Sequence, residues 1–415
     1  MATKQVKALT SLVGMGLVLS ACGSAGRSPV AEHAQLLVAN VTTVHPGAAT
    51  PMPAFSAEMT QLGYEIGQRL HKTSADGNLV YSPASLAIAC AMVREGARGT
   101  AAQQIDQVLH LPVNRSQAFN ALLGSIKKPG SGNVLTVGDA LFAKRGYPVH
   151  ATFLHALKKW YGAGVYQTTF PNEGKAAVNA YVDKQTAGLI PHLITDEFNA
   201  DTVMSLVDTL YLNARWQHRF DKNLTSPGRF TTSMGQVDVK MMDLMRDDMD
   251  YAAGPGWQAV RLPYQGGRLW MEVLLPDAVA QSPMGLLNRQ TLAAAATRFD
   301  GSRVDLALPR WSFGTHASLK PMLTSMGMRA PFSPGGFPGI TDDSRFRLDS
   351  VVQQAHISVG EKGTVAAAAT QIEGIASAGA VDLKVVNVDH PFAYAVVDVT
   401  GVPLFEGTVG DPSAP

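Results

Sequence analysis

Few residues of this chain have the types and spacing that catalysis requires, and the usual catalytic patterns do not occur in it. The sequence contains no H-E-x-x-H, G-x-S-x-G, P-loop, C-x-x-C or strand-linked G-x-G-x-x-G pattern. Ser125 and Lys128 match S-x-x-K, which in penicillin-binding proteins sets a nucleophilic serine one helical turn from a lysine, but the companion S-D-N and K-T-G patterns are missing. The 11 histidines are scattered, and none pairs with a second ligand at metal spacing. We therefore expect no metal and no cofactor, and we keep an S-x-x-K serine hydrolase as a remote alternative.

Cys22 has the setting of a cysteine that is modified rather than catalytic. Lysines precede an apolar stretch, 8–19, that is too short to span a bilayer permanently and is typical of an export signal. The stretch ends in L-S-A-C, which resembles the lipobox of bacterial lipoproteins, where the cysteine sulfur receives a diacylglycerol. We predict a signal peptide over 1–22 and a lipid anchor on Cys22 in the cell envelope, at the outer face of the cytoplasmic membrane or at the outer membrane. Ordinary secretion, with an accidental cysteine at the cleavage site, is the alternative.

Composition predicts one large globular domain after this signal. The 415 residues are 46% hydrophobic and 16% charged, which excludes disorder of the whole chain. Lys and Arg number 34 and Asp and Glu 33, so no charge excess is available to bind a nucleic-acid backbone. Residues 23–54, rich in small and polar residues without a clear period, are predicted to be a flexible tether with a reach on the order of 30 Å. No repeat and no linker divides 55–415, which we predict to be a single domain.

Helices are predicted before strands along this domain. Ser56 precedes apolar residues three and four apart, which indicates a helix capped by that serine, and Thr100 with Gln103 forms a capping-box pattern. Cys90 lies in an apolar run and is expected to be buried in a core helix. Further helices are expected over 116–127, 152–161, 175–189 and 317–326, and strands over 79–81, 203–212, 237–244, 258–262, 269–275, 304–308, 355–359 and 383–388. This order, without βαβ alternation, predicts an α+β domain around large mixed or antiparallel sheets.

The most unusual stretch, residues 361–379, joins two predicted strands. With a period of two, one face of its first half carries only uncharged side chains, at 364, 366, 368, 370 and 372. Small side chains and the absence of proline over 363–380 leave nothing that forbids this segment from becoming a central strand. A flexible low-complexity linker and an alanine-driven helix are the alternatives on these residues alone.

Motifs in a characteristic order carry a family resemblance from about residue 55 to 409. They are N-L-V-Y-S-P-A-S-L at 78–86, E-G-A-R-G-T at 95–100, L-V-D-T-L-Y-L-N-A-R-W at 206–216, L-P-R-W at 308–311 and D-H-P-F at 389–392. Together they resemble the serpins, a family of protease inhibitors. The resemblance implies the serpin fold, with three β-sheets, about nine helices and an exposed reactive-centre loop.

The resemblance also implies a function for the unusual loop. A target protease would cleave it as a substrate and be trapped as an acyl-enzyme when the loop inserts into the main sheet. The implied hinge comprises Glu361, Gly363, Thr364, Val365, Ala366, Ala367, Ala368, Ala369 and Thr370, and counting from Glu361 places the reactive bond at Ser377-Ala378. The chain would then be no enzyme but a monomeric inhibitor of serine or also cysteine proteases, with elastase-like or subtilisin-like targets that accept small residues. A non-inhibitory serpin acting as a cell-surface binding or adhesion module is the alternative.

A second set of residues is implied to control how the main sheet opens. It comprises Ser82, Pro83, Ser85, Asp208, Trp216 and Gln353. Asp208 and Gln353 stand where many serpins have Asn and His bridging the strands that must part. An Asp and a Gln can still form a donor–acceptor pair, so the resemblance implies that the device is retained with an altered pH response.

Overall fold

The computed structural model describes residues 29–45, 52–364 and 382–414. The predicted signal peptide and Cys22, the hinge residues Val365 to Thr370, and the predicted reactive bond at Ser377-Ala378 lie outside these ranges. The described residues contain helices α1 (Pro29–His33), α2 (Pro53–Leu70), α3 (Pro83–Arg94), α4 (Gly99–Val108), α5 (Arg115–Ile126), α6 (Ala151–Ala156), α7 (Gly174–Gln185), α8 (Arg289–Arg298) and α9 (Lys320–Ser325). Within that part of the chain, no helix is long and apolar enough to cross a membrane.

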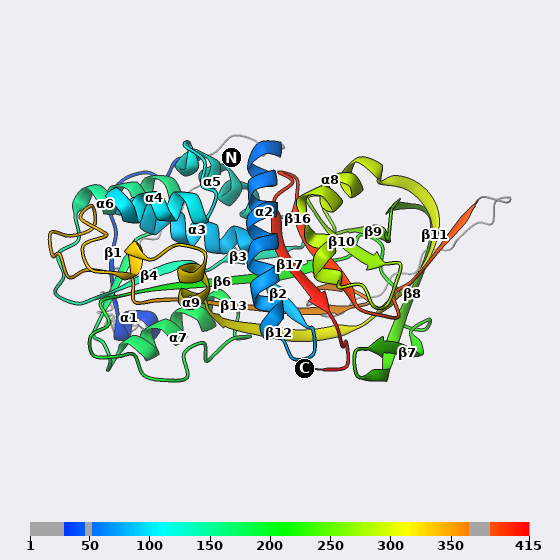
Figure 1. Ribbon diagram of the computed structural model, residues 1–415. Coiled ribbons are helices and arrows are strands. Elements are labelled where there is room, and N and C mark those ends of the chain that lie inside the picture. The colour runs from blue at the N-terminus through cyan, green and yellow to red at the C-terminus, as the bar shows by residue number, and fades with distance from the viewer. Residues whose placement is uncertain (1–28, 46–51, 365–381, 415) are drawn as a thin grey trace, which may run out of the picture.

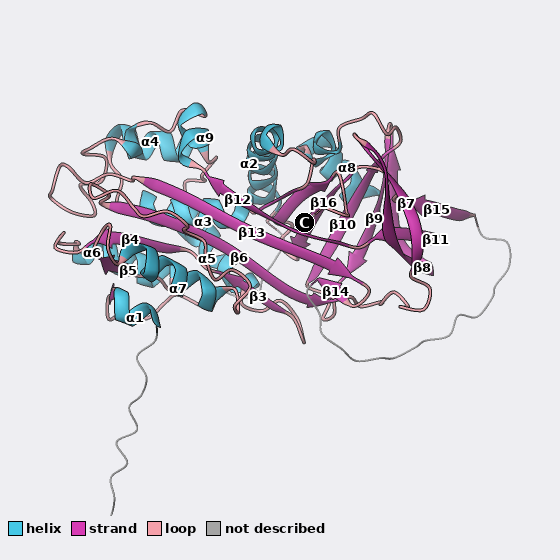
Figure 2. Ribbon diagram, turned by 90° about the horizontal axis from the view of Figure 1, so that it is seen from below, coloured by secondary structure: helices cyan, strands magenta, loops and turns pink. Residues whose placement is uncertain are grey.

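One eight-stranded sheet forms the long axis of the molecule (Figure 2). Its order is β1-β5-β4-β6-β14-β13-β12, and β3 pairs with β6 beside β4. Its strands are β1 (Gln35–Leu37), β3 (Val134–Val137), β4 (Ala140–Lys144), β5 (Val165–Thr168), β6 (Met204–Arg215), β12 (Trp311–Ser318), β13 (Ser350–Gly360) and β14 (Gly363–Thr364). The centre of this sheet, at β6, β14 and β13, is where the predicted loop leaves the fold.

The remaining strands form a nine-stranded network at the other end of the molecule (Figure 1). They are β2 (Leu79–Tyr81), β7 (Ser226–Thr232), β8 (Gly235–Gly254), β9 (Trp257–Pro263), β10 (Leu269–Pro276), β11 (Asp300–Pro309), β15 (Leu383–Asn387), β16 (Phe392–Asp398) and β17 (Pro403–Val409). The sequence predicts three sheets, and the second and third are continuous here because the long strand β8 pairs with β7 and β11 and also with β9. The predicted α+β order, with helices first and strands later, is therefore present.

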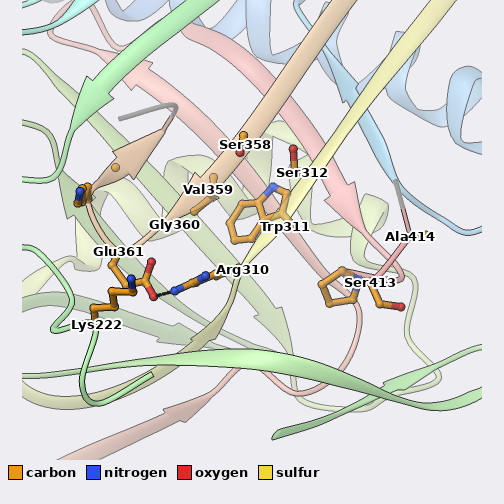
Figure 3. Close-up of a pocket in the computed structure, with 13 residues that line it drawn as sticks. Lys222, Arg310, Trp311, Ser312, Ser358, Val359, Gly360, Glu361, Ser413 and Ala414 are labelled. Carbon is orange, nitrogen blue, oxygen red and sulfur yellow. Dashed lines mark hydrogen bonds and ion pairs between the residues drawn. The ribbon is translucent and has the colours of Figure 1, made fainter. Parts of the chain in front are cut away.

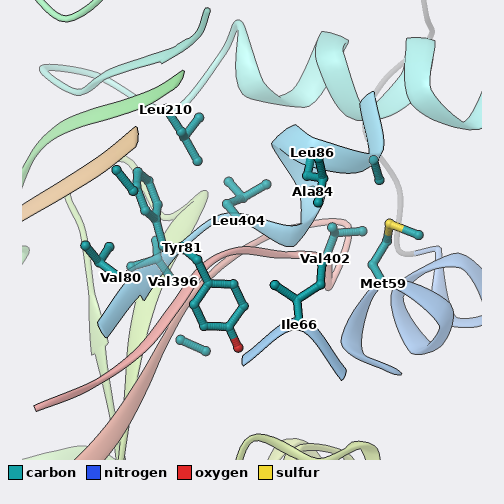
Figure 4. Close-up of a cluster of buried hydrophobic side chains, with 14 of the residues drawn as sticks. Met59, Ile66, Val80, Tyr81, Ala84, Leu86, Leu210, Val396, Val402 and Leu404 are labelled. Atoms are coloured by element: carbon teal, nitrogen blue, oxygen red, sulfur yellow. The ribbon is translucent and has the colours of Figure 1, made fainter. Parts of the chain in front are cut away.

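Helix α3 is the core helix that the apolar run predicts. Ser82 caps it by accepting a hydrogen bond from the Ser85 backbone N–H at 3.0 Å, and Pro83 occupies its first turn. Cys90 is buried, as expected, together with nearly every other residue of this helix. Figure 4 shows the packing that results, where Leu86 of α3 lies among Tyr81, Leu210 and Leu404 from three different strands. The buried helix thus forms a rigid support beneath the centre of the first sheet.

The tether prediction is wrong for residues 29–45. Helix α1 packs against α7, with Val30 and Ala34 buried beside Val178, and β1 pairs antiparallel with β5. Three-residue β1 is too short to show a period, and its exposed Leu36 masks the pattern of a half-buried strand. The folded part therefore begins before residue 55.

Three local predictions also differ from the structure. Helix α2 begins at Pro53, so Ser56 lies inside the helix and its hydroxyl contacts the carbonyl of Gly401. Thr100 is the second residue of α4 and does not cap it. The predicted helix 317–326 begins only at Lys320, because β12 extends to Ser318. Each error concerns an element boundary, where the tertiary partner of the flanking residues decides the outcome.

Candidate functional site at the hinge of the main sheet

The first two residues after the tight turn at 361–362 already occupy a strand position between β6 and β13. In β14, Gly363 lies opposite Arg215 of β6 and Gly360 of β13, and Thr364 lies opposite Ala214 and Val359. Both pairings are antiparallel, as a hairpin from β13 requires. The hinge thus begins a new central strand at one end of the sheet.

Gly363 is required at this position by both space and backbone angle. Its φ of +142° lies in the region that favours glycine, and a Cβ atom there would approach the Ala214 carbonyl oxygen to 2.0 Å. Any side chain at 363 would therefore push the hinge out of the sheet.

Thr364 is held by a buried aromatic pair. Its Oγ1 lies 2.7 Å from the hydroxyl oxygen of Tyr264, and both side chains are buried. Tyr264 stacks on Trp216 with ring centroids 4.5 Å apart, and the Trp216 Nε1–H donates to the Gly360 carbonyl at 2.9 Å. Trp216 therefore lies at the top of the sheet, as the resemblance implies, and fixes the turn from which the loop departs.

Glu361 anchors the hinge from the other side. Its carboxylate accepts a hydrogen bond from Thr225 Oγ1 at 2.7 Å and forms an ion pair with Arg310, and both partners of the ion pair line the pocket drawn in Figure 3. Partial burial raises the pKa of Glu361, but the hydrogen bonds from Thr225 and Arg310, a backbone hydrogen bond and the charge of Arg310 together lower it. The Phe220 N–H also donates to the Glu361 carbonyl at 3.1 Å. Glu361 is therefore ionised at neutral pH and bound to two other segments.

Strands β6 and β13 are separated by β14 at the hinge and pair directly with each other farther from it, and we call the point where they separate the fork. They pair directly and in parallel from Ser350–Ser205 to Ala355–Leu210. Between this ladder and β14, residues 211–213 of β6 pair with β3, and residues 356–358 of β13 pair with β12. On the sides where β6 and β13 face each other, neither of these two sets has a strand partner among the described residues. Unpaired edges that face each other form the slot that an additional strand can fill.

Five of the six predicted sheet-opening residues lie together, two residues beyond the point where β6 and β13 begin to pair directly, whereas Trp216 lies apart from them beside the hinge. Gln353 Nε2–H donates to Asp208 Oδ2 at 2.5 Å and to the Ser82 carbonyl at 2.9 Å, and the Ser82 N–H donates to Gln353 Oε1 at 3.2 Å. The Ser85 hydroxyl contacts Asp208 Oδ1. The expected donor–acceptor pair of Asp208 and Gln353 is therefore present, and it connects β6, β13 and the start of α3.

The structure adds Asp139, which the sequence analysis missed. Asp139 directly precedes β4, and its Oδ1 lies 3.0 Å from the Ser85 hydroxyl. Burial first, and then the charge of Asp208 and a hydrogen bond to it, raise the pKa of Asp139 well above its usual value. Burial also raises the pKa of Asp208, to about 6, although hydrogen bonds from Ser85 and Gln353 oppose this. The detectable signal was an acidic residue in an apolar segment, at V-G-D-A-L-F.

The S-x-x-K residues do not form a catalytic pair. Ser125 is buried at the end of α5, where its hydroxyl accepts from Arg268 at 3.4 Å. Burial raises the pKa of Asp398, and a hydrogen bond from Ser125 opposes that rise. Lys128 lies beyond the helix end with an exposed side chain. No group of three or more His, Cys, Asp or Glu side chains in the described ranges could hold a metal ion.

Comparisons with known proteins agree on one family. A family model described as serpin (serine protease inhibitor) matches residues 57–412. An uncharacterised serpin-like protein of Thermococcus kodakarensis is 32% identical over 348 residues, which cover 81% of each chain. Serpin B3 of Homo sapiens is 29% identical over 391 residues, covering 87% of this chain and 100% of that one. Among solved structures, the thermophilic serpin tengpin in its native state has the same fold, with a TM-score of 0.79 at 23% identity over 91% of this chain and 100% of its own.

Proposed function

This chain belongs to the serpin family, and from that premise we propose that it is a suicide-substrate inhibitor of serine proteases, and also of cysteine proteases. The observation that carries the proposal is the pairing of Gly363 and Thr364 with both β6 and β13. The alternating register that begins there favours insertion over a linker or a helix, because the first loop residues are already in strand geometry.

The register supports insertion of the rest of the hinge. Continued from Thr364, it would place Ala366 opposite Leu212 and Ala368 opposite Leu210, on the buried face of β6. It would then place Thr370 between Asp208 and Gln353. Small side chains fit this face because the core beneath it is already packed. The Thr370 hydroxyl would lie within reach of the polar side chains of Asp208 and Gln353.

The reaction follows from this loop acting as a substrate. The nucleophile of the target protease bonds to the carbonyl carbon of Ser377, and the bond from that carbon to the Ala378 nitrogen breaks, with a proton passing from the protease to the leaving amine. Insertion of the freed strand then carries the attached protease away before water cleaves the acyl bond. Ile375, Ala376, Ser377 and Ala378 suit elastase-like or subtilisin-like enzymes, since their pockets accept small residues.

The direct test is incubation with proteases of these two kinds. We expect a covalent complex that survives a denaturing gel, with cleavage at Ser377-Ala378. Thr364→Arg should yield cleaved protein and no complex, because it buries a charge beside Tyr264. Val365→Arg is the matched control: it adds the same charge to the opposite face of the inserting strand and should still trap the protease. Cleavage without complex across the panel would refute the inhibitory function and leave the non-inhibitory alternative, a surface binding module, to be tested.

We further propose that the inhibitor is exported and anchored to the cell envelope through lipid on Cys22. Several acyl chains, each burying many CH₂ groups at about 0.8 kcal/mol apiece, would hold it on a membrane. Cys22→Ser should move the protein from the membrane fraction to the medium or periplasm in the producing cell. Equal membrane retention of both forms would refute the anchor.

A further inference from the structure

Two carboxyl groups, Asp139 and Asp208, converge on one hydroxyl beneath the fork of the main sheet. The Ser85 hydroxyl lies 3.0 Å from Asp139 Oδ1 and also contacts Asp208 Oδ1. A hydroxyl carries one proton, so it can donate to only one of the two carboxyls at a time. Asp139 Oδ2 is shielded from solvent and has no hydrogen-bond partner among the described residues. Two ionised carboxylates are therefore poorly accommodated at this point.

The surroundings provide no cation to balance two negative charges. Helix α3 contributes Ser85 and the buried thiol of Cys90, whose pKa is raised by burial and by both carboxyls. From α7, the Tyr181 hydroxyl donates to the backbone carbonyl of Asp139 at 3.2 Å. Strand β13 contributes the amide of Gln353. In the part of the chain that the structure describes, no Lys, Arg or His contributes to the electrostatics of either carboxyl.

We propose that Asp139 and Asp208 share one proton in the closed sheet, and that Asp139 is a positioning residue whose loss of this proton favours the parting of β6 and β13. The proposal rests on the proposed function, because parting these strands matters only if the loop inserts. Asp139 acts through Asp208, which is joined to Gln353 across the two strands. Like-charge carboxyls in contact cannot both ionise readily, which is the general reason that such pairs retain a proton.

The direction of the pH effect follows from proton linkage. In the closed sheet, burial raises the pKa of Asp208 to about 6 and that of Asp139 well above its usual value. Parting the strands admits water, which returns both groups toward the ordinary aspartate range near 4. The closed sheet thus binds more protons than the open sheet, and raising the pH above this ordinary range favours opening. Each proton released accelerates opening by at most about tenfold per pH unit.

The experiment measures opening directly, without a protease. A blocked synthetic peptide with the sequence of residues 364–372, T-V-A-A-A-A-T-Q-I, contains no titratable side chain and fits the register of the slot. Its insertion into the full-length protein is followed on native gels and as a gain in thermal stability. For the wild type we expect the insertion rate to rise several-fold per pH unit between about pH 5 and 7. In Asp139→Asn, a permanent neutral donor replaces the shared proton, so the rate should stay near the low wild-type value across this range.

Two further variants separate this device from other pH effects. Asp208→Asn removes the second member of the pair and should also flatten the profile. Glu406→Gln is the matched control, because Glu406 is a buried acid whose pKa burial raises to about 8, bonded to Tyr81 away from the strands that part. The peptide insertion rate of Glu406→Gln should therefore rise with pH as steeply as that of the wild type. An unchanged slope in Asp139→Asn, or a flat profile in the wild type, would overturn the proposal.

A spectroscopic measurement decides the matter even if a variant fails to fold. Infrared spectra of the wild type at neutral pH should contain two carboxylic acid contributions, because Glu406 also retains its proton there. One should disappear in Asp208→Asn or Asp139→Asn and persist in Glu406→Gln, which removes only the contribution of Glu406. Absence of that first contribution refutes the shared proton. Peptide insertion with the predicted pH slope but no trapped protease would instead leave the proton device intact and reject the inhibitory function.

Discussion

Replacement of Gln353 by Ala tests whether the polar cluster holds β6 and β13 together. The side chain makes one hydrogen bond to a carboxylate and two to the backbone of Ser82. A hydrogen bond to a charged group contributes about 1.5–3 kcal/mol and a neutral one about 0.5–1.5 kcal/mol. We therefore expect the free energy of unfolding to fall by about 2.5–6 kcal/mol. For a domain of this size, that corresponds to a fall in melting temperature on the order of 5 °C.

The same substitution should also accelerate sheet opening. The bond from Gln353 to Asp208 must break before a strand can pass between their register positions. If about 1.4 kcal/mol of that bond is felt in the transition state, peptide insertion becomes tenfold faster. Gln354→Ala is the control, since this residue is the next along β13 and faces the opposite side of the sheet. Equal stability and equal insertion rates for the two variants would refute the assignment of these bonds to sheet closure.

Three further predictions concern the N-terminal segment, the hinge anchor and a second buried acid. Val30→Asp should release residues 29–45 from α7, detected as earlier cleavage in limited proteolysis, whereas Leu36→Asp on the exposed side of β1 should not. Glu361→Gln should lower stability at neutral pH, and its difference from the wild type should vanish in acid, as pH falls through the lowered pKa of Glu361 and the ion pair with Arg310 is lost. Burial raises the pKa of Glu406 to about 8, so the folded state binds this proton more tightly than the unfolded state does. Wild-type stability should therefore fall as the pH rises from about 5 to 8, and denaturant titrations of Glu406→Gln across this range should show a smaller fall.

The parts of the fold that the sequence predicted are those with a strong local pattern. The apolar run around Cys90 specified a buried helix. The Asp208–Gln353 pair had no such local pattern and was implied by the family resemblance, and the structure contains it. Asp139 escaped prediction because its partner is brought close only by the pairing of β4 with β6. Strand β1 escaped because its partner, β5, lies far along the chain and three residues carry no period.

The hinge residues differ in how far sequence alone could assign them. Gly363 and Thr364 were placed in the hinge by the family resemblance, yet only the structure shows why each is needed. The positive φ and the close Ala214 carbonyl account for the glycine, and the hydroxyl of Tyr264 accounts for the threonine. Both reasons depend on residues at 214 and 264, which no local pattern connects to the loop.

On the proposed insertion of the loop, the geometry where β6 and β13 separate predicts that the polar cluster of Ser82, Asp208 and Gln353, and not the hinge, resists insertion. The first residues to follow Thr364 would enter between edges at 211–213 and 356–358 that are unpaired on their inner sides, so they gain hydrogen bonds without breaking any. Past Ala355–Leu210, each further residue must replace a parallel pairing of β6 with β13 by two antiparallel ones. The second residue below that point meets Gln353 and Asp208, whose side-chain bonds must be broken before the backbone bonds form. On this proposal, the energy released by a completed central strand becomes available only after the bonds of this cluster have broken, so its protonation state would control the whole transition.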